Sequence, residues 1–150
     1  MATRVETLLD TLATKLLADA AITAGSVYNS RSAAFSDTEL PAYNLTIGQD
    51  VPLDDLGAAN VAFIDWAQII YVDCYAKSVA AEIDTVFLTM RRNVHRALMA
   101  DPTQGLNFVW TTIPQGGEQP VIDSSGEQKT MVYRLNWEFR LRTSIGSLES

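Results

Sequence analysis

The chain has little of several residue types that catalytic and metal-binding sites use. Its 150 residues include one cysteine, Cys74, and one histidine, His95. A single cysteine excludes an internal disulfide and a Cys-rich zinc site, and a single histidine removes most His-based metal and triad arrangements. Basic residues are also few, since 11 Lys and Arg against 18 Asp and Glu give a net charge of -7. This acidic balance speaks against a nucleic-acid ligand that is gripped through its phosphates.

Long apolar runs are missing too. No segment reaches the roughly 18–20 uninterrupted apolar residues that a membrane span needs. The first residues are charged and amphipathic rather than basic and then apolar, so we expect no signal peptide, no membrane partner and synthesis in the cytoplasm. What the chain does have is 47% hydrophobic and 19% charged residues, which is typical of a folded protein. Its length predicts a single domain over residues 1–150.

Hydrophobic periodicity predicts two amphipathic helices. Thr3 and Glu6 have the spacing of a capping box, and leucines then recur at helical spacing until Gly25 stops the first helix. Ser78 can cap a second helix over residues 79–100, which Asp101 and the following proline end. Arg91, Arg92 and Arg96 of this helix match the direction of the helix dipole, which is a better explanation for them than nucleic-acid binding.

Strands are predicted over residues 26–31, 41–47, 64–75, 106–113 and 130–143. The last has the cleanest alternation, with one apolar face: Met131, Tyr133, Leu135, Trp137, Phe139 and Leu141. The order α-β-β-β-α-β-β predicts an α+β fold with a mainly antiparallel or mixed sheet of about four to five strands and two helices packed on one face.

The strand over residues 64–75 has no fully polar face. Its less apolar side carries Asp65, Ala67, Ile69, Tyr71, Asp73 and Tyr75. We expect something to cover both faces of this strand. In the last strand, alternation places Arg134, Glu138, Arg140 and Arg142 together on the outward face. Either these side chains are solvated, or they pair with carboxylates across a subunit boundary; both interpretations stay open.

Two segments are predicted to lie outside the regular elements. Residues 48–60 combine acids with Gly and Pro, which indicates a mobile loop, and residues 144–150 form a C-terminal tail. The loop offers residues for docking on a partner: Asp50, Leu53, Asp54, Asp55 and Leu56. Its acids lack the ligand spacing of a calcium loop. A second loop is expected over residues 114–126.

No catalytic, metal or cofactor site emerges from the sequence. His95 has basic neighbours and no orienting carboxylate nearby in sequence, which favours a surface or packing role. Cys74 lies on the apolar face of a predicted strand, which favours a buried, inert thiol. The sequence therefore predicts a protein that is not an enzyme.

One pattern of residues and elements resembles a known family. After the first helix come Arg31, Ala34-Phe35, Glu39 and Pro41-Ala42, then the acidic loop, a strand centred on Trp66, a helix carrying Asp84 and the long alternating strand. This pattern resembles the tail-terminator family of long-tailed bacteriophages, of the minor tail protein U type. The likeness in element order and length spans nearly the whole chain. The loop over residues 114–126 and the C-terminal extension depart from the family pattern.

The resemblance implies a virion protein at the head-proximal end of the tail. It would form a homo-oligomer, a hexameric ring, that caps the tail tube, ends tube polymerisation and offers a joining surface to a head-completion or neck protein. DNA would pass through its lumen without specific binding, which suits a negative charge. The alternatives are a neck, head–tail connector or tail-completion protein of related fold, and a small α+β ligand-binding module. The expected interface residues are Arg31, Asp65, Ile69, Tyr71, Asp73, Arg134, Glu138, Arg140 and Arg142.

Overall fold

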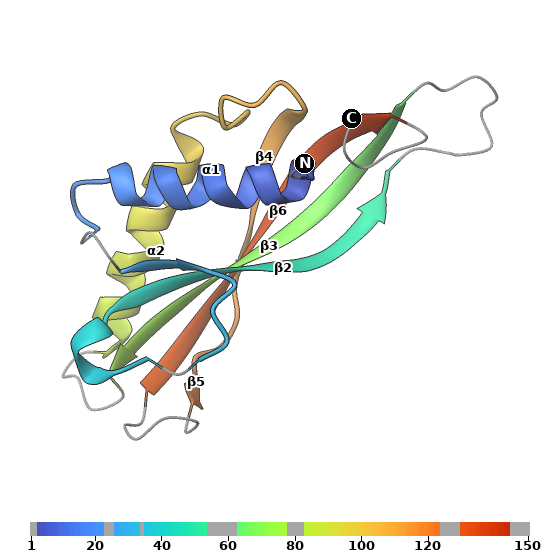
Figure 1. The fold of residues 1–150 in the computed structure, drawn as a ribbon. Coiled ribbons are helices and arrows are strands. Elements are labelled where there is room, and N and C mark those ends of the chain that lie inside the picture. The colour runs from blue at the N-terminus through green and yellow to red at the C-terminus, as the bar shows by residue number, and fades with distance from the viewer. Residues whose placement is uncertain are drawn as a thin grey trace.

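The computed structural model describes residues 3–22, 26–33, 35–53, 63–77, 83–123 and 130–144. These form an α+β fold with two helices and a six-stranded mixed sheet (Figure 1). In chain order the elements are α1 (Arg4–Ala18), β1 (Val27–Asn29), the 3-10 turn η1 (Asp37–Glu39), β2 (Ala42–Pro52), β3 (Phe63–Lys77), α2 (Ile83–Met99), β4 (Val109–Gly117), β5 (Val121–Asp123) and β6 (Thr130–Ser144). The predicted fold class and element order are confirmed, with β5 as an added strand.

The sheet is built around its two longest strands. Its strand order is β1-β2-β3-β6-β4, with β5 also paired to β6. β3 and β6 are antiparallel and pair along their full length, from Phe63 opposite Ser144 to Lys77 opposite Thr130. Only the pairing of β1 with β2 is parallel among the described strands. The strict two-residue alternation of β6 fixes this register, because a one-residue slip would turn its apolar side chains outward.

Both helices pack on the same face of the sheet and enclose one hydrophobic core. The predicted capping box is present: the Thr3 side chain accepts from the Glu6 backbone, and the Glu6 side chain accepts from the Thr3 backbone. Neither described helix is long and apolar enough to cross a bilayer. The core takes its side chains from α1, α2, β3 and β6: Leu8, Leu12, Leu16, Phe87, Val94, Leu98, Ile70, Val72, Cys74, Leu135, Trp137 and Phe139. The predicted inward face of β6 is thus confirmed.

Four predicted boundaries are wrong. α1 ends at Ala18, with Asp19 as its C-cap, well before Gly25, where the sequence predicted the stop. β2 continues through Gly48 to Pro52, where a loop was expected, because β3 pairs with it beyond an irregularity between Ile47 and Asp50. β4 continues to Gly117 and β5 follows, so the expected loop over residues 114–126 is partly strand. The 3-residue β1 is shorter than the strand expected over residues 26–31.

Other predicted features lie outside the described residues. These are the loop beyond Leu53, with Asp54, Asp55 and Leu56, the cap at Ser78, and the C-terminal tail after Ser144. The described part of α2 begins at Ile83.

β2 and β3 extend together away from both helices, toward the upper right in Figure 1. We call the described residues 47–53 and 63–66 of this extension the arm. Several of its apolar side chains are exposed: Ile47, Val51, Leu53 and Phe63.

Candidate interaction surface

The face of β3 and β6 that points away from the helices is the candidate functional site. We call it the open face. Register and alternation place on it Asp65, Ala67, Ile69, Tyr71, Asp73 and Tyr75 of β3, and Val132, Arg134, Asn136, Glu138, Arg140 and Arg142 of β6. Eight of the nine predicted interface residues lie here, because the β3–β6 register brings the predicted face of each strand onto one surface. Their role in subunit contact stays a prediction.

The arginines of the open face pair with carboxylates of the same chain. Arg134 makes two bonds to Asp73, from Nε to Oδ1 at 2.7 Å and from Nη2 to Oδ2 at 2.9 Å. Arg142 binds Asp65 in the same way, also at 2.7 and 2.9 Å. Both pairs join directly opposite residues of β3 and β6. This planar, two-bond geometry is the strong form of an arginine–carboxylate contact.

The two pairs differ in burial. The Asp73 side chain is only 4% exposed, whereas the Arg142 side chain is 56% exposed. The hydrogen bonds that Arg134 donates to Asp73 raise the pKa of Arg134, and those that Arg142 donates to Asp65 lower the pKa of Asp65. A third pair joins Arg140 Nε to Glu138 Oε2 at 3.1 Å. The open face therefore presents charges that are already matched within the chain.

Tyr71 occupies the centre of the open face. The Arg134 guanidinium lies 4.2 Å from its ring centroid, in cation–π geometry. The ring also lies over Gly48 of β2, where an added Cβ would come within 2.8 Å of Tyr71 Cε2. Only a residue without a side chain leaves room for the ring there. Gly48, which was expected to begin a loop, lies within β2 and permits this packing.

Two buried oxygen atoms beside Tyr71 have no hydrogen-bond partner within the described residues. They are Thr46 Oγ1 and Asn136 Oδ1, from the residues that flank Tyr71 on β2 and β6. An unpaired buried polar group costs about 1–3 kcal/mol. The centre of the open face is therefore not optimised for the stability of the chain alone, as is common at functional surfaces.

Arg31 lies at the β1 edge of this surface. It forms an ion pair with Glu39, and its guanidinium lies 4.8 Å from the Tyr28 ring centroid and 4.4 Å from that of Phe35. The Phe35 ring in turn lies 4.6 Å from that of Tyr75 on the open face. Hydrogen bonds from Arg31 and from Ser36 hold the pKa of Glu39 far below its ordinary value. The Arg31, Phe35 and Glu39 pattern thus forms an internal cluster that fixes the edge of the sheet.

A hollow of about 560 Å³ lies at one end of the open face. Asp73, Tyr75 and Arg134 contribute to its lining, together with the exposed apolar side chains Val121 and Ile122 of β5. The sequence prediction missed these two residues. Two β-branched residues after Pro120 were the available signal, but a run of three residues is too short to separate from a loop.

The single cysteine and the single histidine of the chain lie in different environments. Cys74 is fully buried, and burial raises the pKa of its thiol, as predicted for an inert cysteine. His95 is exposed on α2, where its ring lies 5.8 Å from that of Trp137. Within the described ranges, no three His, Cys, Asp or Glu side chains gather as metal ligands would.

Comparison with known proteins gives information on the fold alone. No family model matches the sequence, and a search of curated proteins finds no match either. Among solved structures, the fold is similar to that of a chain in the virion of a native gene transfer agent particle. The TM-score is 0.51 at 10% sequence identity, and the alignment covers 91% of this chain and 95% of that chain. The chain therefore shares its overall fold with a virion component, over almost the full length of both.

Proposed function

We propose that the chain is a structural virion protein that forms a ring on the end of a phage tail tube, stops tube growth and joins the tail to the head. The observation that carries the proposal is the full-length fold likeness to a chain of a gene transfer agent virion. The tail-terminator resemblance of the sequence supports the finer assignment.

The open face supports an assembly role. It is a broad sheet surface with stacked aromatic and arginine side chains and with charges matched inside the chain. Such a surface can be covered by a partner without leaving an unpaired charge, which is the costly event at an interface. An enzyme would instead require convergent polar groups around a reacting centre.

Tube growth in the presence of the chain tests the proposal. Purified tail-tube protein is polymerised with and without the chain, and tube length and tube ends are measured by negative-stain electron microscopy. We expect capped tubes that stop growing, with a ring at one end. A chain that forms rings but leaves tube length unchanged would favour the neck or tail-completion role. A chain that neither assembles nor binds tubes would contradict both roles.

A further inference from the structure

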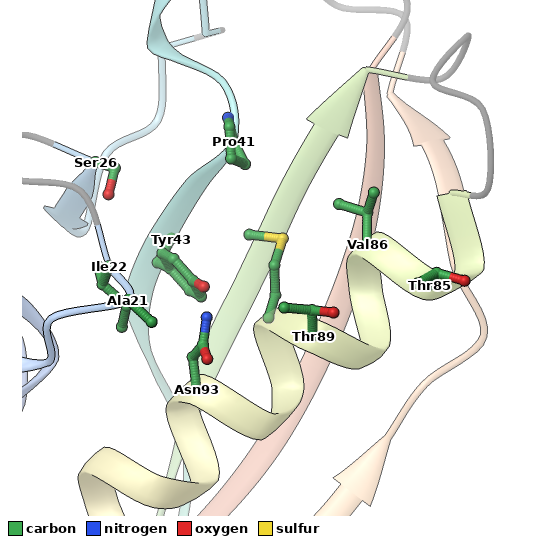
Figure 2. Close-up of a pocket in the computed structure, with 10 residues that line it drawn as sticks. Ala21, Ile22, Ser26, Pro41, Tyr43, Thr85, Val86, Thr89 and Asn93 are labelled. Atoms are coloured by element: carbon green, nitrogen blue, oxygen red, sulfur yellow. The ribbon is translucent and has the colours of Figure 1, made fainter.

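A second hollow lies on the helix-covered side of the molecule, between α2, β2 and the segment after α1 (Figure 2). Its volume is about 280 Å³, larger than the cavity of about 150 Å³ that accommodates benzene. Figure 2 shows Ile22, Pro41 and Val86 around the opening, with the Tyr43 ring directed toward Asn93. Burial raises the pKa of Tyr43 to about 12, so its hydroxyl is neutral at physiological pH. The hollow is thus mainly apolar with some neutral polar side chains, is lined by no charged side chain among the described residues, and is open to solvent.

A basic helix edge borders this hollow. Thr85, Thr89 and Asn93 line it from α2, and Arg92 follows Thr89 by three residues, which makes the two neighbours on the helix surface. Arg92 is exposed, and no carboxylate of the described residues pairs with it. The other arginines of α2 are engaged: Arg91 donates to the Tyr133 hydroxyl and Arg96 binds Asp19. Arg92 is the available cation at the hollow.

The arm has the opposite character. Val51, Leu53 and Phe63 are 45%, 42% and 49% exposed, an unusual cluster of large apolar side chains. Asp50 directly precedes Val51 in β2, so its side chain projects from the opposite face of the strand. It is exposed and pairs with no cation of the described part of the chain. The sequence from residue 49 to residue 65 contains acids but no Lys or Arg. The arm is therefore apolar and acidic, where the hollow is apolar with a basic border.

The arm and the hollow cannot meet within one chain. The arm points away from both helices in Figure 1, whereas the hollow lies beside α2. We propose that the arm of one copy docks in the hollow of a second copy, with Val51 and Leu53 against Ile22, Val86 and Met90. Asp50, on the other face of the strand, then lies at the border of the hollow, within reach of the long Arg92 side chain. This inference rests on the proposed ring, and it names the contact that builds it. A head-to-tail contact of this kind uses two different surfaces and closes a ring when the rotation between copies allows.

Charge reversal tests the pairing of Asp50 with Arg92. We expect Asp50→Lys and Arg92→Glu each to raise the concentration needed for assembly about tenfold or more, measured by sedimentation velocity. The double variant Asp50→Lys/Arg92→Glu restores the pair with reversed charges and should recover most of the assembly. Asp10→Lys, the same charge change at an exposed site on α1, serves as the matched control and should assemble like the parent.

Mixing experiments test the head-to-tail geometry. Thr89→Trp fills the hollow and leaves the arm intact, and Asp50→Lys weakens the arm and leaves the hollow intact. Mixed together, the two variants retain one working contact, so we expect a dimer with one copy of each and no ring. Melting temperatures of both variants should stay close to that of the parent, because both changed residues are exposed.

The outcomes separate this inference from the proposed function. Recovery by the double variant together with a mixed dimer supports the arm-in-hollow contact. A parent that forms rings while all these variants assemble equally well would overturn the inference and leave the ring in place. A parent that remains a monomer at every concentration and with tube protein would overturn both.

Discussion

The two faces of the same pair of strands are stabilised in different ways. On the covered face, alternate residues of β3 and β6 bury Ile70, Val72, Leu135 and Phe139 under the helices. On the open face, the residues between them form cross-strand arginine–carboxylate pairs and arginine–aromatic stacks. The covered face is held by removal of apolar surface from water, and the open face by mutual pairing of polar groups.

The ion pairs within the chain limit how the open face can contact a partner. Its arginines were expected either to be solvated or to reach carboxylates of a neighbour. Arg134 and Arg142 already hold Asp73 and Asp65 of their own chain, so a neighbour's carboxylate would have to compete with two-bond pairs. We therefore expect the open face to contact partners through its shape and its aromatic side chains, with the ion pairs keeping these in position.

Removal of a large side chain from the covered face should have the greatest effect on stability. Phe139 is fully buried, and we expect Phe139→Ala to lower the free energy of unfolding by about 3–5 kcal/mol. Ile69→Ala on the open face is the matched control, with an expected loss of about 1 kcal/mol because Ile69 is only partly buried. Urea unfolding of both variants measures this, and equal losses would contradict the distinction between the faces.

Breaking the buried Asp73–Arg134 pair of the open face should have the second-largest effect on stability. Arg134→Ala leaves the Asp73 carboxylate buried without its cation, so we expect a loss of about 2–4 kcal/mol. The double variant Asp73→Ala/Arg134→Ala also removes the unpaired Asp73 carboxylate, so it should be more stable than Arg134→Ala alone. A double variant no more stable than the single one would show that Asp73 finds water or another partner.

The exposed pair should contribute much less. Arg142 is more than half exposed, and a pair of this kind is worth about 0.2–1 kcal/mol. We expect Arg142→Ala to fall in this range, with an effect that shrinks in high salt because exposed charges are screened. Unfolding curves at low and high ionic strength check the prediction, and a loss as large as that of Arg134→Ala would remove the contrast between the two pairs.

Substitution of Glu39 should change the stability little at neutral pH, but it should change how the stability depends on pH. The pKa of Glu39 lies far below its ordinary value of 4.5 in the folded chain. Its stabilising contribution is therefore complete above about pH 5 and is lost as the pH falls below 4.5. We expect Glu39→Gln to be less sensitive to acid than the parent, measured as the melting-temperature difference between pH 7 and pH 3. The same acid loss in both proteins would contradict the role of this carboxylate.

The sequence predicted the parts of the fold that depend on local periodicity. The alternation of β6 and the leucine spacing of α1 each repeat over several turns or pairs, so their buried faces were predictable. The extension of β2 through Gly48 and Pro52 was missed because these residues stop strands in general, and only pairing with β3 offsets their low propensity. The 3-residue β5 carries too little periodicity for a prediction.

The candidate site was predictable as a face but not as a network. Period-two alternation indicated that Arg134 and Arg142 point the same way as each other, and that Asp65 and Asp73 do so on another strand. Asp65 lies directly opposite Arg142, and Asp73 lies directly opposite Arg134. Both pairings depend on the β3–β6 register, which is a tertiary property. The stack of Arg134 on Tyr71, and the space that Gly48 leaves for the ring, likewise depend on three strands at once.

Native mass spectrometry of the purified chain, with negative-stain imaging of the same sample, shows whether the chain assembles into a ring. We expect a closed ring of fixed stoichiometry, hexameric according to the family resemblance, that appears as concentration rises or as tail-tube protein is added. A chain that stays monomeric under all of these conditions, or that forms only a symmetric dimer, would contradict the ring and the head-to-tail contact proposed to build it.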